Sequence, residues 1–145
     1  MKHLDMYVAI ADTNIFVRAF LSKNFQEDAI LRKIFREGYR FLYGKDQLKE
    51  FIEVLGYKRL KKHYQIDRDD IDRFVKLIIK MGKLVEAEPC DLCRDPDDNY
   101  ILGLAIRASK RQEVCLVTGD KDILDLKKKL KNVTILKPGD LLKLC

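Results

Sequence analysis

Apolar residues along this chain fall into two alternating patterns. Short runs that are almost continuously apolar predict strands buried on both faces of a sheet, and they occur at Met6–Ala11, Tyr39–Tyr43, Leu84–Ala87, Val114–Val117 and Val133–Leu136. Between these runs, apolar residues recur at every third or fourth position, which is the spacing of one helix face. Strands that alternate with helices predict an α/β fold, in which helices cover both sides of a parallel sheet.

Polar caps and glycines set the expected bounds of the helices. The pair Asp95-Pro96 predicts a sharp helix start, because Asp caps a helix and Pro fits its first turn. Helices are expected at Ile15–Leu21, Phe25–Arg36 and Asp46–Lys62, and a fourth should run from a cap at Asp67 or Asp69 to Gly82. The last three are expected at Asp95–Ser109, Asp122–Leu130 and Pro138–Leu144. In the third helix, Gly56 weakens the expected continuity, and the apolar stripe comprises Leu48, Phe51, Ile52 and Leu55. No repeat or linker interrupts the pattern, so we expect a single domain over residues 1–145.

The composition indicates a globular protein with an excess of basic charge. The chain has 29 Lys and Arg against 23 Asp and Glu, a net charge of +6, which suits a polyanionic partner but is equally compatible with a soluble protein of high pI that has none. No run of about 18 apolar residues predicts a membrane span, and the N-terminal segment lacks the pattern of a signal peptide. Together with four cysteines that predict a reducing compartment by default, this leads us to expect a cytoplasmic protein without a membrane partner.

Two aspartates follow the strongest predicted strands. Asp12 ends the run Met6–Ala11, and Asp120 comes after Val114–Val117 and a short Thr118-Gly119 turn. In open α/β sheets, ligands bind outside the carboxyl ends of the strands, where the strand order reverses. Asp also caps helices at such turns, but two acids in equivalent positions favour a ligand site over two unrelated caps.

Two further acids lie on predicted helices. Asp98 is the third residue after the Asp95 cap, on the same stripe as Ile101 and Leu102, so it is either an inward-facing carboxylate or part of a capping box. Glu50 lies roughly opposite the apolar stripe of its helix, which on its own is more typical of a solvated acid.

Carboxylates brought together need a counterion. At a separation of ~4 Å and an effective dielectric constant near 20, each pair costs about 4 kcal/mol, so a cluster is tolerable when it holds a divalent cation or retains protons. Oxygen ligands favour Mg²⁺ or Mn²⁺ over zinc. Such a cation beside basic surface points to phosphodiester chemistry.

Four segments resemble the PIN domain family in their order and intervals. They are VAIADTNIFVRAFL, DQLKEFIEVL, RDPDDNYILGLA and LVTGDKDIL, and the resemblance extends from about Tyr7 to Leu142. More narrowly, the chain resembles stand-alone prokaryotic PIN proteins described as toxins of toxin–antitoxin pairs. Any one segment is a weak signal, whereas four in register are a strong one.

The resemblance implies a three-layer α/β/α fold, with a five-stranded parallel sheet in the order 3-2-1-4-5. It implies an endoribonuclease that depends on Mg²⁺ or Mn²⁺, with an RNA substrate, a homodimeric assembly and, for a toxin, an antitoxin partner. The family's catalytic and metal-binding acids correspond to Asp12, Glu50, Asp98 and Asp120, with Asp122 as a further metal ligand and Asn14 and Thr118 as supporting residues.

Two other features have open interpretations. The segment Tyr57–His63 is basic, and we expect its RNA-binding residues to be Lys58, Arg59, Lys61 and Lys62, although a solvated helix face gives the same pattern. Cys90 and Cys93 form a C-x-x-C pair without the second pair that a zinc site requires, and a structural role is more common for such a pair.

Two rival functions are compatible with part of the pattern. A phosphatase of the haloacid dehalogenase type would use Asp12 as nucleophile, but it needs a second acid at the position of Asn14. A catalytically silent PIN-like module would bind RNA or a partner without cutting, yet none of the family's acids is missing here.

Overall fold

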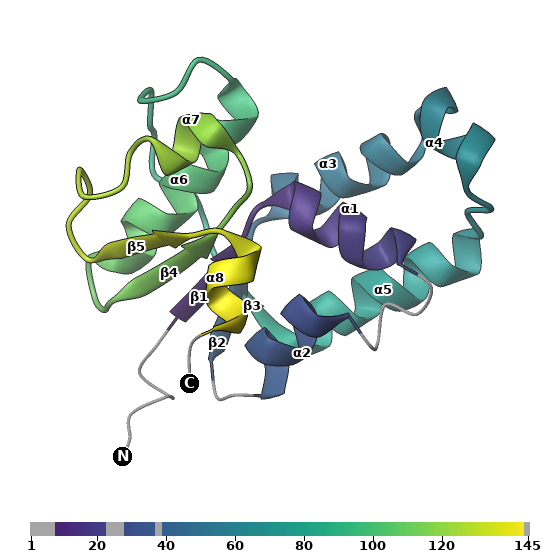
Figure 1. Ribbon diagram of the computed structural model, residues 1–145, viewed down its shortest axis with the longest axis horizontal. Coiled ribbons are helices and arrows are strands. Elements are labelled where there is room, and N and C mark those ends of the chain that lie inside the picture. The colour runs from purple at the N-terminus through teal and green to yellow at the C-terminus, as the bar shows by residue number, and fades with distance from the viewer. Residues whose placement is uncertain (1–7, 23–27, 37–38, 144–145) are drawn as a thin grey trace.

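The computed structural model describes residues 8–22, 28–36 and 39–143 (Figure 1). Within these residues, one parallel sheet has the strand order β3-β2-β1-β4-β5, as the resemblance implied. The strands are β1 (Val8–Ala11), β2 (Arg40–Tyr43), β3 (Gly82–Leu84), β4 (Val114–Val117) and β5 (Val133–Leu136). The strand order reverses at β1, which pairs with β2 on one side and β4 on the other, so ligands are expected outside the carboxyl ends of β1 and β4.

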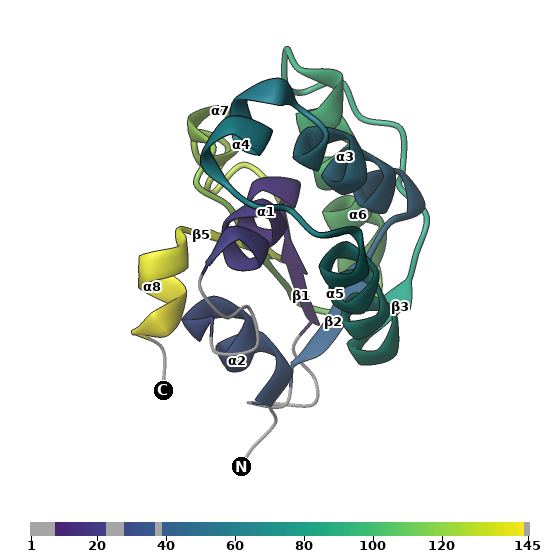
Figure 2. The same cartoon turned by 90° about the vertical axis from the view of Figure 1, so that its right-hand side faces the viewer.

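Helices cover both sides of the sheet (Figure 2). They are α1 (Thr13–Leu21), α2 (Ala29–Arg36), α3 (Lys45–Leu55), α4 (Lys58–His63), α5 (Arg68–Met81), α6 (Pro96–Ser109), α7 (Lys121–Leu124) and α8 (Pro138–Leu142). The core beneath α1, α3 and α5 is aromatic, with Phe16, Phe51 and Phe74 stacked or edge to face. The core beneath α6 and α7 is aliphatic, built from residues such as Leu102 and Leu116. No helix among the described residues is long and apolar enough to cross a membrane.

The expected helix over Asp46–Lys62 is two helices. Gly56 ends α3, its amide bonding the carbonyl of Glu53 at 3.0 Å, and extended Tyr57 precedes α4. A mid-helix glycine costs about 1 kcal/mol relative to alanine, which favours a break at this point. The predicted stripe was also wrong in one member, because Ile52 is 48% exposed.

The third strand lies two residues earlier than predicted, at Gly82–Leu84 rather than Leu84–Ala87. Gly82 pairs with Phe41, and a Cβ atom at Gly82 would come within 2.6 Å of the Phe41 ring and 2.8 Å of the Tyr43 ring. This glycine therefore permits a close approach of two strands, whereas the sequence pattern treated it only as a helix stop.

The helix predicted over Asp122–Leu130 is also shorter, since α7 ends at Leu124 and turns follow. Lys128 has a positive φ of 70°, which is incompatible with a continuing helix. β4, β5 and α6 have the predicted bounds, and β2 begins at Arg40, one residue later than predicted. Parts of three predicted elements (residues 6–7, 25–27 and 144) lie outside the described residues.

Candidate metal centre

The paired ends of β1 and β4 bring two acids to one edge of the sheet. Ala11 and Val117 are register partners, and each is followed closely by an aspartate that caps the next helix: Asp12 caps α1 and Asp120 caps α7. The backbone amide of Asp12 bonds the carbonyl of Val117 at 3.0 Å, which extends the pairing past the end of β1.

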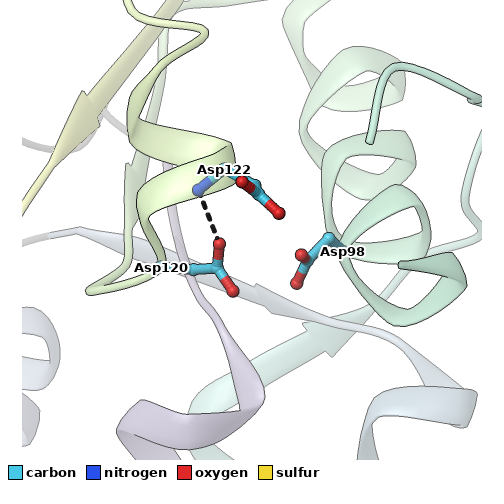
Figure 3. Close-up of side chains that lie close together, drawn as sticks. All are labelled: Asp98, Asp120 and Asp122. Carbon is cyan, nitrogen blue, oxygen red and sulfur yellow. Dashed lines mark hydrogen bonds between the residues drawn. The ribbon is translucent and has the colours of Figure 1, made fainter. Parts of the chain in front are cut away.

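Asp98, Asp120 and Asp122 form a compact group that we call the acidic cluster. Each offers a carboxylate oxygen, and these oxygens all lie within 4.8 Å of one another. Figure 3 shows Asp98 projecting from the first turn of α6 toward Asp120 and Asp122, which come from the start of α7. The backbone amide of Asp122 donates to Asp120 Oδ1 at 2.8 Å. Among the described residues, no Lys, Arg or His forms an ion pair with these three acids.

The electrostatic balance of the acidic cluster is reflected in the pKa of Asp98. Burial raises this pKa to about 7, and the negative charges of Asp120, Asp95, Asp12 and Asp122 add to the shift. A carboxyl group that retains its proton near neutral pH in this way lies where positive charge is lacking. A cation placed among the three carboxylates would reverse the effect.

Asp12 is not part of the acidic cluster, and its carboxylate accepts hydrogen bonds from neighbouring residues. It is only 5% exposed, and one of its oxygens accepts from the amides of Asn14 at 2.8 Å and Ile15 at 3.3 Å. Its other oxygen accepts from the Thr118 hydroxyl. Burial raises the pKa of Asp12, and the charge of Asp120 adds to this, while these hydrogen bonds lower it.

Thr118 connects Asp12 to the acidic cluster. Its hydroxyl donates to Asp12 and accepts from the amide of Asp120 at 3.0 Å, and the residue is fully buried. Asn14, the other expected supporting residue, contributes its backbone amide, while its side chain is exposed.

Glu50 is not one of the three carboxylates of the acidic cluster. Burial raises its pKa to about 7, a hydrogen bond with Asp97 adds to the shift, and the Thr13 hydroxyl opposes it. Glu50 therefore faces the start of α6 and α1, and the interpretation of its position as a solvated helix face was wrong. The Thr13 hydroxyl is buried near Glu50 but makes no hydrogen bond with any described residue.

Gln47 is a positioning residue that the sequence analysis missed. Its side-chain amide donates to the carbonyl of Ala11, directly before Asp12, and its oxygen accepts from the Gly44 amide at 3.2 Å. It is 1% exposed and lies four residues before Phe51, so helical spacing from Phe51 would have placed it on the buried stripe. Gln47 thereby fixes α3, and with it Glu50, against the end of β1.

Tyr100 connects α3 and α6. Its hydroxyl accepts from the backbone amide of Asp46 at 3.2 Å. The hydroxyl occupies the space beside Gly44 so closely that a Cβ atom at Gly44 would overlap it. The two helices that carry Glu50 and Asp98 are therefore joined at their N-terminal turns.

The predicted basic residues lie on a separate element from the acids. Lys58, Arg59, Lys61 and Lys62 are all exposed on α4, and Figure 1 shows α4 and α7 in the upper part of the view but on opposite sides of it, with α1 and α3 between them.

Cys90 and Cys93 belong to a loop that Asn99 holds in place. Asn99 accepts from the amide of Cys93 at 2.7 Å and donates to its carbonyl at 2.8 Å. Burial, with the nearby Asp98 charge, raises the pKa of the Cys93 thiol to about 11, so it is not a thiolate near neutral pH. Neither cysteine belongs to a three-ligand metal group among the described residues, which fits a structural role.

Comparisons with known proteins agree with this architecture. A family model described as the PIN domain matches residues 8–122. An uncharacterized protein of Methanocaldococcus jannaschii is 28% identical over 139 residues, which cover 93% of this chain and 84% of the relative. The crystal structure of PAE2754 from Pyrobaculum aerophilum superposes with a TM-score of 0.55 and 18% identity, covering 94% of this chain and 88% of that one, which shows a common fold. This chain therefore belongs to the PIN domain family, whose members are generally nucleases.

Proposed function

We propose that this protein is an endoribonuclease that depends on Mg²⁺ or Mn²⁺ and hydrolyses RNA phosphodiester bonds at the acidic cluster. The observation that carries the proposal is the group of three carboxylates within 4.8 Å at the carboxyl end of a PIN-type sheet. Like charges this close, without an ion-paired cation among the described residues, favour a divalent cation as their partner.

The donor set fits such a cation. All three proposed ligands are carboxylate oxygens, which match hard ions, and the Cys93 thiol, whose pKa is raised to about 11, does not compete. When bound, the cation would stabilise negative charge on the scissile phosphate and lower the pKa of a water molecule. Asp98, Asp120 and Asp122 are its proposed ligands, with Asp12 and Glu50 completing the acidic site.

The chain's own residues orient the site. Thr118 holds the Asp12 carboxylate and the Asp120 backbone in fixed relation, so the charge of Asp12 is directed toward the cluster. Glu50, with a pKa near 7, is suited to exchanging a proton at neutral pH. The exposed cations of α4 supply phosphate contacts along the strand, away from the acids.

The direct test is cleavage of a panel of labelled RNAs by the purified protein with Mn²⁺, with Mg²⁺ and with EDTA. Asp120→Asn is the informative variant, because Asn caps a helix as well as Asp and preserves the start of α7. Asp72→Asn, at an exposed position on α5, is the matched control. We expect metal-dependent cleavage by the parent and the control, and at least about a 100-fold loss in Asp120→Asn, since even indirect supports of a metal ligand contribute 10–100-fold.

Two outcomes would contradict the proposal. Equal cleavage by the parent and by Asp120→Asn would mean that another nuclease is responsible. No cleavage of any RNA by the parent with either metal would favour the catalytically silent binding module.

A role as the toxin of a toxin–antitoxin pair is part of the same proposal. A toxin of a toxin–antitoxin pair would act as a cytoplasmic ribonuclease, with an antitoxin covering the acidic site and a homodimeric assembly. Co-expression with the product of a small adjacent gene, followed by cleavage assays on the complex, tests this role, and full activity in the complex would contradict it.

A further inference from the structure

A basic cleft lies at the opposite end of α6 from the acidic cluster. It has a volume of about 940 Å³ and is enclosed by the first residues of β2 and β3 and by the last turn of α6 with the residues that follow. A volume of this size is in the range of ligand sites. Its basic residues are Arg40, Lys83, Arg107, Lys110 and Arg111.

The sheet register explains why residues from separate elements converge there. Lys83 is the register partner of Leu42, and Arg40 lies two residues before Leu42, so all three side chains point to the same face of the sheet. Leu42 packs in the core that α6 covers. The side chains of Arg40 and Lys83 therefore lie on the face where α6 ends, beside Arg107 in its last turn.

The cleft concentrates positive charge that the fold does not neutralise. Five basic residues face only two acids, Glu86 and Glu88, a net charge of +3 against +6 for the whole chain. Lys110 pairs with Glu88 at 2.7 Å. Arg40, Lys83, Arg107 and Arg111 form no ion pair with any residue that the structure describes, and all four are exposed. A cleft lined mainly by one sign of charge raises the local concentration of anions.

We propose that this basic cleft binds phosphate groups of an RNA strand remote from the acidic cluster, an inference that rests on the proposed ribonuclease function. Three of its cations are arginines, whose planar guanidinium groups bind phosphate oxygens in pairs. Arg107 follows Asp98 by nine residues, about 14 Å along the axis of α6. The cleft would therefore hold a part of the strand other than the cleaved bond.

A neighbouring cleft differs from the basic cleft in its charge. It has a volume of about 630 Å³, shares Val85, Glu86 and Glu88 with the basic cleft, and extends toward the start of α6. Its only cation is Lys45, while Asp46 joins the two glutamates, so it repels phosphate. Of these two clefts, the basic cleft is therefore the one suited to phosphate groups.

The test measures RNA binding in EDTA, where cleavage does not occur. Single-stranded RNA of about 20 nucleotides is titrated by fluorescence anisotropy across a salt series, because each phosphate contact contributes about −0.7 to the slope of log K against log salt. The test variant is Arg107→Ala with Arg111→Ala. The control is Arg68→Ala with Lys76→Ala, two exposed positions on α5 that remove the same charge on the other side of the sheet.

We expect the test variant to bind at least ~10-fold more weakly at low salt, with a slope reduced by about 1.4, and the control to change less than ~2-fold. Arg107→Lys with Arg111→Lys conserves charge and helix propensity, so it should restore the slope while recovering only part of the affinity. This variant also separates lost contacts from a folding defect, which thermal melting checks directly.

Equal affinities and slopes in the test variant and the control would overturn the inference, and an acidic protein would then be the better candidate for the cleft. These measurements do not depend on catalysis. An inactive parent would contradict the proposed function, whereas an unchanged salt slope would contradict only the RNA contact at the basic cleft.

Discussion

Asp12 and Asp98 lie at the same edge of the sheet, and burial raises the pKa of both, yet their carboxylates differ in hydrogen bonding. Asp12 accepts hydrogen bonds from two backbone amides and from Thr118. Asp98 accepts none from the described residues, and its pKa is raised to about 7. Hydrogen bonds within the fold offset part of the cost of burying the Asp12 charge, whereas the charge of Asp98 has no such donors among the described residues. The difference separates an acid that builds the site from one that is available for binding.

The largest expected effect comes from Asp98→Asn, which should impair activity and improve stability at once. The loss of this proposed metal-binding carboxylate should lower RNA cleavage at least ~100-fold. In EDTA at pH 8 the variant should melt at a higher temperature than the parent, because an unfavourable buried charge is gone. Mn²⁺ at ~100 times its Kd would stabilise the parent by about 2.7 kcal/mol and the variant by less. A variant that melts at a lower temperature than the parent, and that Mn²⁺ stabilises as much as the parent, would contradict the assignment of Asp98 as the acid available for binding.

Thr118→Val removes the hydroxyl that connects the two kinds of acid. The Asp12 carboxylate loses a donor and the Asp120 amide loses its acceptor, while side-chain volume is nearly unchanged. We expect a 10–100-fold loss of metal-dependent cleavage, the usual range for residues that orient ligands. Thr118→Ser keeps the hydroxyl and should retain most of the activity, so equal losses in both variants would argue against the connection.

Asp12→Ala should have the opposite effect on stability to Asp98→Asn. It removes the cap of α1 and leaves the Thr118 hydroxyl without its acceptor, at a cost of about 1–2 kcal/mol in the free energy of unfolding. Urea denaturation in EDTA measures the change. Asp12→Asn preserves the cap and should recover part of the loss, and a stabilised Asp12→Ala protein would show that repulsion outweighs the hydrogen bonds.

The smallest effect concerns pH. The pKa values of Asp98 and Glu50 are raised from 3.8 and 4.5 to about 7, so between these values the folded chain binds more protons than the unfolded chain. Their contribution to the stability of the metal-free protein is therefore greatest at acidic pH and is lost as pH rises toward 7. Melting temperatures in EDTA across this range test the trend, which Glu50→Gln should flatten. Melting temperatures that change with pH in parallel for the parent and for Glu50→Gln would contradict this trend.

The sequence predicted the positions of candidate site residues where those positions depend only on local structure. Asp12 and Asp120 were recognisable because each follows an apolar strand, and Asp98 because the Asp95-Pro96 start fixes its place in α6. These inferences need only the geometry of a strand end or of a first helical turn. The strand order followed from the resemblance to the PIN family and agrees with the structure.

The surroundings of Glu50 were not predictable in this way, because they depend on which face of α3 packs inward. Counting Ile52 as apolar and Gln47 as polar rotated the expected stripe toward the wrong side. The buried Gln47 is stabilised by a hydrogen bond to the Ala11 carbonyl, a partner 36 residues away that no local pattern reveals. The position of β3 was missed for a related reason, because the Phe41 and Tyr43 rings of the adjacent strand leave no room for a side chain at Gly82.

The contact between Gly44 and Tyr100 has a consequence for how this site can change during evolution. Because the Tyr100 hydroxyl fills the place of a side chain at Gly44, any larger residue at position 44 requires a smaller one at position 100. Loss of the tyrosine also removes an acceptor from the Asp46 amide. The two positions should therefore covary among homologues, and a single substitution at either would shift Glu50 relative to Asp98 while every acid of the candidate site is still present.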